Sequence, residues 1–114
     1  MPGPMSKITY SKEALRDLDE IFDYISKTLH NKAAAIHTVQ RIQSDIDKLA
    51  TFPEMGPSLS SMIVRKSEYR FLVSGNYIAF YLIGDELVEI ARVLYGRRNY
   101  MSLLFGSLIE EDSE

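Results

Sequence analysis

The segment Ser74–Tyr95, with the sequence SGNYIAFYLIGDELVEIARVLY, decides the fold of this chain. Its two runs rich in Val, Ile, Tyr and Phe, residues 77–83 and 87–95, have the composition of β-strands. Turn signals occupy residues 74–76 and 84–86, on either side of the first run. Because links this short join only antiparallel neighbours, the segment predicts an antiparallel β-hairpin.

Two candidate strands precede this hairpin. Tyr69–Val73 leads directly into the first turn, and Met62–Arg65 has a similar apolar composition. The pattern therefore predicts a three- to four-stranded antiparallel meander. A further short extended segment, Lys7–Tyr10, is expected near the N-terminus.

Both faces of the run 77–83 are apolar. Tyr77, Ala79, Tyr81 and Ile83 alternate with Ile78, Phe80 and Leu82. In a sheet this small two helices can cover only one face. The other face is therefore expected to be covered by the C-terminal segment or by a partner protein.

Helical periodicity fills the region between Lys7–Tyr10 and the meander. Ser11 is expected to cap a first helix, and Asn31 a second helix that ends before Pro53. Apolar residues recur at helical spacing: Ala14, Leu15, Leu18, Ile21, Phe22, Ile25 and Leu29, then Ala35, Val39, Ile42, Ile46 and Leu49. The short link predicts an antiparallel helical hairpin on one face of the sheet, an α+β fold.

Composition limits the possible classes of function. The 114 residues include no cysteine, 46% are hydrophobic, and the net charge is −3. No apolar run reaches the roughly 18 residues of a membrane span, and no secretion signal is recognisable, so a cytoplasmic location without membrane contact is expected. Residues 1–6 are expected to form a flexible leader, 7–105 a single domain with a short helix over 99–105, and 106–114 an acidic tail.

Arginines concentrate in the second half of the chain. The densest cluster is RVLYGRRNY at residues 92–100, and Arg65 and Arg70 lie on earlier strands. A meander brings such strands side by side, so these guanidinium groups can form one surface suited to phosphate or carboxylate. Tyr95 and Tyr100 add stacking area or a weak acid. The alternative is that the arginines make ordinary contacts with acidic helix faces.

Other chemistries find little support in the sequence. His30 and His37 are seven residues apart, too far for a one-turn zinc pair, and no glycine-rich phosphate loop occurs. Ser74 and Ser102 have no evident histidine base. We therefore expect neither a metal nor another cofactor.

The order of the elements and three local signatures resemble the RelE/ParE superfamily of bacterial toxins. The signatures are LATFPEMG at 49–56, YRFL at 69–72 followed by GNYIAFY at 75–81, and VEIARVLYGRR at 88–98. The resemblance covers roughly residues 7–104. It implies a toxin that a separate antitoxin, usually encoded beside it, wraps and neutralises, which accounts for the two-sided apolar sheet.

The resemblance leaves two mechanisms open. ParE-like members poison DNA gyrase and have no established hydrolytic site, whereas RelE-like members cleave messenger RNA on the ribosome without a metal. For cleavage, Arg70 and Arg98 are the expected phosphate stabilisers and Tyr100 the expected acid, with Arg92 in support. For gyrase inhibition, Arg65, Arg92, Arg97 and Tyr95 are the expected partner or target contacts.

Three departures weigh against the nuclease. The net charge is acidic, no long lysine-rich run precedes the hairpin, and no histidine lies near the C-terminus. The ending YGRR at 95–98 is closer to ParE-like members, although Asn99 replaces their usual aspartate. Gyrase inhibition is therefore the first expectation, RNA cleavage the second, and a non-toxic module that binds an acidic peptide the third.

Overall fold

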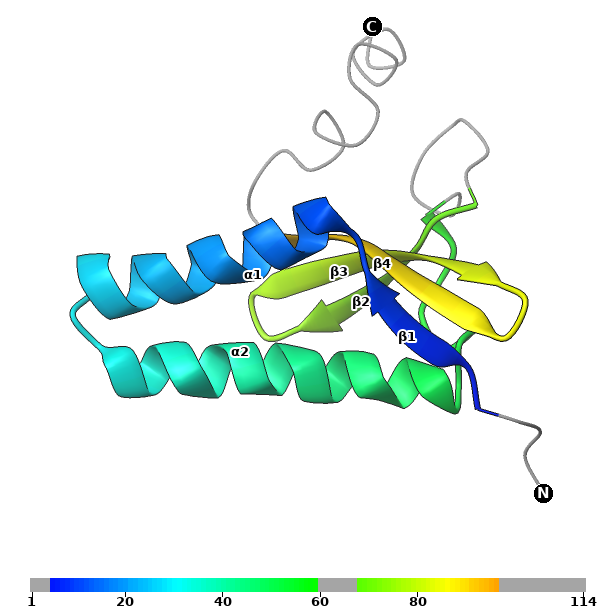
Figure 1. Ribbon diagram of the computed structural model, residues 1–114, viewed down its shortest axis with the longest axis horizontal. Helices are drawn as coiled ribbons and strands as arrows, with labels where there is room; N and C mark the ends of the chain where they lie inside the picture. Colours follow the sequence, from blue (N-terminus) through cyan, green and yellow to red (C-terminus); the bar gives the residue numbers. More distant parts are fainter. Residues whose placement is uncertain (1–4, 60–67, 97–114) are drawn as a thin grey trace, which may run out of the picture.

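The computed structural model of the chain describes residues 5–59 and 68–96. A strand, a helical hairpin and three further strands follow one another along the chain (Figure 1). The strands are β1 (Lys7–Tyr10), β2 (Arg70–Ser74), β3 (Tyr77–Gly84) and β4 (Leu87–Tyr95). The helices are α1 (Lys12–Asp23) and α2 (Lys32–Asp47), extended by a π-helical turn, Tyr24–Thr28, and a 3-10 turn, Lys48–Ala50.

The two predicted helix caps are confirmed. The Ser11 hydroxyl accepts a hydrogen bond from the Ala14 amide at 3.0 Å, and the Asn31 side chain accepts one from the Ala34 amide at 2.9 Å. Between the helices, the Leu29 amide donates to the Tyr24 carbonyl at 3.2 Å. His30 then turns the chain back with a positive φ of 52°. The sequence pattern did not predict the π-helical turn.

The helices pack against the sheet through most of the predicted stripe. The core joins residues of both helices to Ala79, Tyr81, Val88, Ile90 and Val93 of the sheet. The prediction was wrong for Leu15 and Leu29, which are 51% and 54% exposed. Leu15 lies one residue beyond the buried position Ala14, and Leu29 directly follows the π-helical turn between the helices. This end of the hairpin extends past the end of the sheet (Figure 1).

The sheet has the strand order β1-β4-β3-β2. The antiparallel meander β2-β3-β4 is as predicted. Its neighbour on the other side is β1, which pairs with β4 in parallel, so the sheet is mixed. The candidate strand Met62–Arg65 and the candidate helix 99–105 lie outside the described residues. A β-bulge displaces the register of β4, because Phe80 pairs with Arg92 while Tyr81 pairs with Ile90.

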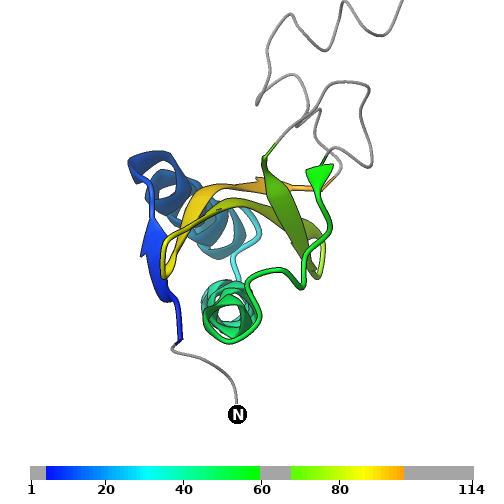
Figure 2. The same ribbon diagram turned by 90° about the vertical axis from the view of Figure 1, so that its right-hand side faces the viewer.

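Both faces of β3 carry buried side chains, but the second face is covered in part by a segment other than the C-terminal segment or partner protein expected from the sequence. Ala79 and Tyr81 pack on the helices, which lie together on one face of the sheet (Figure 2). On the other face Phe80 forms a small second core with Leu59 and Leu94. Part of the cover of this second face thus comes from the segment that precedes β2. Whether the C-terminal segment adds to it lies outside the described residues.

Candidate functional site

Arg92, a predicted contact residue, forms an ion pair with Asp17 of α1. Its Nε donates to Asp17 Oδ2 at 2.8 Å, and a terminal nitrogen donates to Oδ1 at 3.0 Å. The two side chains are 26% and 7% exposed, respectively. The hydrogen bonds that Arg92 donates to Asp17 raise the pKa of the Arg92 guanidinium, although partial burial opposes the change. Arg92 is therefore positively charged, and its guanidinium group is bound to Asp17 within the fold.

The Asp17 carboxylate also accepts a hydrogen bond from a backbone amide of β4 that β1 does not reach. β1 pairs with β4 only as far as Ile90, since the chain turns into α1 at Ser11. The Val93 amide lies beyond the end of β1, and Asp17 Oδ2 accepts its hydrogen bond at 2.9 Å. Asp17 thus satisfies three donors, which compensates the cost of burying its charge. A role of Arg92 in target binding stays a prediction.

Arg70, the predicted phosphate stabiliser, lies against the loop that follows α2. One of its terminal nitrogens donates to the Gly56 carbonyl at 2.6 Å and approaches the Glu54 carbonyl at 3.4 Å. Tyr81 of β3 binds the same loop. Its hydroxyl donates to the Pro53 carbonyl at 2.8 Å and accepts from the Gly56 amide at 3.1 Å. Burial raises the pKa of the Tyr81 phenol, which stays neutral and able to donate.

Gly56 allows the loop to approach the sheet this closely. A Cβ atom at this position would lie 2.3 Å from the Phe71 carbonyl oxygen and 2.6 Å from the Tyr81 hydroxyl oxygen. The backbone therefore has room here only for glycine. The segment LATFPEMG and the hairpin signatures thus describe one packed unit, in which Arg70 and Tyr81 hold the loop onto β2 and β3.

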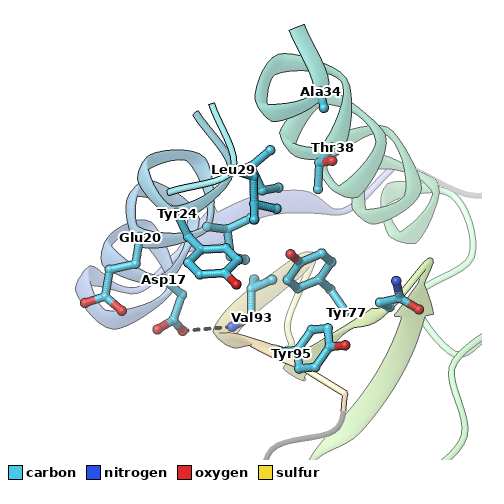
Figure 3. Close-up of a pocket in the computed structure, with 12 residues that line it drawn as sticks. Asp17, Glu20, Tyr24, Leu29, Ala34, Thr38, Tyr77, Val93 and Tyr95 are labelled. Carbon is cyan, nitrogen blue, oxygen red and sulfur yellow. Dashed lines mark hydrogen bonds between the residues drawn. The ribbon is translucent and has the colours of Figure 1, made fainter. Parts of the chain in front are cut away.

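Tyr95 lies at the mouth of a cleft between the hairpin and the sheet. Its ring meets that of Tyr77, its cross-strand partner, edge to face with 5.7 Å between centroids. The cleft has a volume of about 880 Å³. Figure 3 shows Tyr24, from the hairpin, turned towards the same space as Tyr77 and Tyr95. Apolar side chains of the hairpin, among them Ile21 and Leu29, form the opposite wall.

The cleft combines apolar, aromatic and acidic character. Asp17 and Glu20 line one side of it, and no lysine or arginine is among the described residues that line it. Burial raises the pKa of Tyr77, and the nearby phenols of Tyr95 and Tyr24 raise it further. The Tyr77 hydroxyl is therefore neutral near pH 7 and available as a donor.

The other predicted site residues lie outside the described part of the chain. These are Arg65, Arg97, Arg98 and Tyr100. Their assembly into one surface with Arg70 stays a prediction. Within residues 5–59 and 68–96, no group of three or more His, Cys, Asp or Glu side chains could hold a metal ion. No helix in these ranges is long and apolar enough to cross a membrane.

The sequence interpretation missed Asp17, Tyr24 and Tyr77 as functional candidates. Asp17 carried a usable signal, because it lies three residues after Ala14 and next to Leu18, in the buried phase of α1. A carboxylate at such a position requires a partner. The sequence gives no comparable signal for Tyr24 and Tyr77, because only the packing of the hairpin over the end of the sheet brings these two residues together.

The sequence model described as "ParE toxin of type II toxin-antitoxin system, parDE" matches residues 8–100. This chain belongs to the ParE toxin family. The matched range contains every described element of the ParE-family chain except the first residue of β1.

Solved structures share the fold of this ParE-family toxin. The "Chromosomal ParDE TA system from P. aeruginosa" aligns with a TM-score of 0.68 and 21% identity over 82% of this chain and 98% of that one. The toxin–antitoxin complex RelBE2 from Mycobacterium tuberculosis aligns with a TM-score of 0.50 and 23% identity over 82% and 99%. YafQ from E. coli strain BL21(DE3) aligns with a TM-score of 0.50 and 18% identity over 89% of this chain and 99% of that one. No curated protein sequence matches the chain significantly.

Proposed function

We propose that this toxin arrests bacterial growth by inhibiting DNA gyrase and that a cognate antitoxin keeps it inactive. The observation that supports this best is the match of the ParE family over residues 8–100. The proposed place of action is the cytoplasm, where gyrase acts. No cofactor or metal is part of the proposal.

The described arginines favour gyrase inhibition over cleavage of a phosphodiester. Arg92 is bound to Asp17, and Arg70 donates to backbone carbonyls of the loop at Glu54 and Gly56. A cleavage site needs cations that face the substrate phosphate in its transition state. Arg70 and Arg92, two of the four residues expected in such a site, therefore already make contacts within the fold.

Ribosome-dependent cleavage of messenger RNA is the second candidate. It is favoured by the cationic cluster at residues 97–98 and by Tyr100, which supply two guanidinium groups and a phenol in the sequence that follows β4. Arg70 is only partly buried, so a substrate phosphate can still compete for its remaining nitrogens. The net charge of −3 opposes a general affinity for RNA.

The two candidates separate in one experiment. The toxin is expressed from a tight promoter without antitoxin, and plasmid topology and total RNA are sampled within minutes of growth arrest. Purified toxin is assayed in parallel for inhibition of supercoiling by purified gyrase. Gyrase inhibition predicts relaxed or broken DNA with intact messages, whereas cleaved messages with normal supercoiling would favour the nuclease.

Arginine variants then test the assigned residues. We expect Arg97→Ala with Arg98→Ala to abolish arrest under either mechanism, and retained arrest would contradict both assignments. Arg70→Ala with Arg98→Ala is expected to eliminate ribosome-dependent cleavage if the protein is a nuclease. Thermal melting of each variant shows whether the loop held by Arg70 is still in place.

A further inference from the structure

The cleft between the hairpin and the sheet has large apolar side chains that are exposed to solvent. Tyr24 and Leu29, which line it, are 55% and 54% exposed, although both belong to the hairpin whose other apolar side chains form the core. Exposed large apolar side chains around a concave site of this size are typical of a surface that a partner covers. A volume of about 880 Å³ admits several side chains of a segment.

The polar groups of the cleft indicate the charge of its occupant. Asp17 is bound by Arg92, whose charge also acts on Glu20 of the same helix. Glu20 is exposed, and its carboxylate forms no ion pair or hydrogen bond with a described residue, so it is the acid available to a partner. No lysine or arginine of the described chain competes for it within the lining. Among the described residues, no hydrogen bond engages the hydroxyls of Tyr24, Tyr77 or Tyr95, the three rings that share this space (Figure 3).

Tyrosine faces and a nearby carboxylate together recognise a cation on an apolar stem. A Lys or Arg side chain over a tyrosine ring is attracted by the ring quadrupole, and its methylene groups pack on apolar walls. A carboxylate at the rim of the cleft attracts this cation as it approaches and then forms an ion pair with it. Tyrosine is also one of the residue types enriched among the residues that contribute most to binding at protein interfaces, since it offers a large rigid ring with a polar end.

We propose that this cleft seats an apolar segment of the antitoxin, one of whose Lys or Arg side chains enters between Tyr24, Tyr77 and Tyr95 and pairs with Glu20. The inference rests on the proposed function, in which an antitoxin silences the toxin. It adds the place of contact and the chemistry of the contacting segment.

A second copy of the chain suits this cleft less well than a basic partner. A two-fold symmetric contact through the mouth places the same residues of both copies together. It therefore brings the two Glu20 carboxylates, and the acidic faces of both α1 helices, close to each other. Like charges brought together in an interface oppose association.

The test compares matched variants in binding to the protein encoded by the adjacent gene, the expected antitoxin. Calorimetry measures the dissociation constant of each purified toxin variant for this protein. We expect Tyr24→Ala to weaken binding by about tenfold or more, and Tyr24→Phe, which keeps the ring, to stay within about threefold of wild type. Leu15→Ala, at an equally exposed position of α1 outside the cleft, is the control and should bind as wild type.

A charge variant tests the acidic rim separately. Glu20→Lys is expected to weaken binding by about tenfold or more, because it repels the incoming cation. Asp19→Lys makes the same change at the neighbouring exposed position, outside the lining, and should remain within about threefold. All these positions are exposed, so the variants are expected to fold, and circular dichroism checks that they do.

Three outcomes would overturn the proposal. One is binding by Tyr24→Ala and Glu20→Lys at wild-type strength, and another is a wild-type toxin that does not bind the neighbouring protein. The third is self-association of the wild-type chain in sedimentation experiments that Tyr24→Ala abolishes, which would assign the cleft to a second copy. Each leaves gyrase inhibition standing if the wild-type toxin still blocks supercoiling. Conversely, cleft-dependent binding by a toxin that does not inhibit gyrase would refute the proposed target alone.

Discussion

Asp17 illustrates how one side chain links three parts of the molecule. It lies on α1, binds the Arg92 guanidinium and accepts the Val93 amide of β4. Its side chain is 7% exposed, so its charge depends on these donors. Such a carboxylate stabilises the fold because it connects the helix to the sheet, whereas an isolated surface charge would contribute little to stability.

We expect Asp17→Asn to lower the free energy of unfolding by about 2–4 kcal/mol, because it leaves a partly buried guanidinium without its counter-charge. Denaturant unfolding measures the change. Asp19→Asn alters an exposed acid of the same helix and should change stability by less than about 0.5 kcal/mol. Equal stability of the two variants would show that the ion pair contributes nothing.

Gly56 gives a second prediction at the residue scale. We expect Gly56→Ala to destabilise the fold by about 1–3 kcal/mol, since the added methyl group meets the Phe71 carbonyl and the Tyr81 hydroxyl. Thermal melting with and without the substitution measures it. Gly84→Ala is the control, because a Cβ there meets nothing closer than 3.9 Å. A variant as stable as wild type would mean that the loop lies farther from β2 than described.

At the scale of elements, Asp45 joins α2 to the edge strand β2. The Ser74 hydroxyl, which is buried, donates to Asp45 Oδ2 at 2.6 Å. Lys48 lies 3.1 Å from the other carboxylate oxygen. The hydrogen bond from Ser74 and the neighbouring cations lower the pKa of Asp45 below its usual value of 3.8, against the effect of burial. The charged form of Asp45 is therefore the form that holds the two elements together.

This lowered pKa makes part of the stability depend on pH. Because the folded-state pKa lies below the unfolded one, the contribution is fully present well above pH 3.8 and is lost as the pH falls through the folded-state value. We expect Asp45→Asn to destabilise the protein at pH 7 and to lose less stability than wild type on acidification below about pH 5. Denaturation curves across this range measure both effects. Parallel pH profiles for the two proteins would contradict the assignment.

The whole molecule is organised around a sheet that buries side chains on both faces. Helices cover Ala79 and Tyr81, while Phe80, which is 0% exposed, belongs to a smaller core with Leu59 and Leu94. The second face is thus partly a core of the toxin itself. An open apolar surface lies at the end of the sheet, in the cleft under the hairpin.

We therefore expect Phe80→Ala to lower the free energy of unfolding by about 3–5 kcal/mol, the usual effect of removing a buried aromatic ring. Chemical denaturation of the purified toxin measures this. Val73→Ala, on the edge strand and 58% exposed, is the control and should have a small effect. If Phe80→Ala instead left stability intact and impaired antitoxin binding, the second face would be a docking surface.

Local pattern alone determined much of this protein. The caps at Ser11 and Asn31, the helical hairpin and the meander β2-β3-β4 follow from spacing, capping chemistry and turn residues, which act between near neighbours in the chain. The order of the signatures at 49–56, 69–81 and 88–98 also indicated the toxin family that the match over residues 8–100 shows.

Only the tertiary structure decided the rest. The parallel pairing of β1 with β4 joins residues about 80 positions apart, and no local pattern encodes such a partner. The same is true of Arg92 and Asp17, which are 75 positions apart, and of the cleft where Tyr24 meets Tyr77 and Tyr95. A sequence shows which side chains carry charge or aromatic rings. The packing of distant elements determines whether an arginine pairs inside the fold or faces a partner.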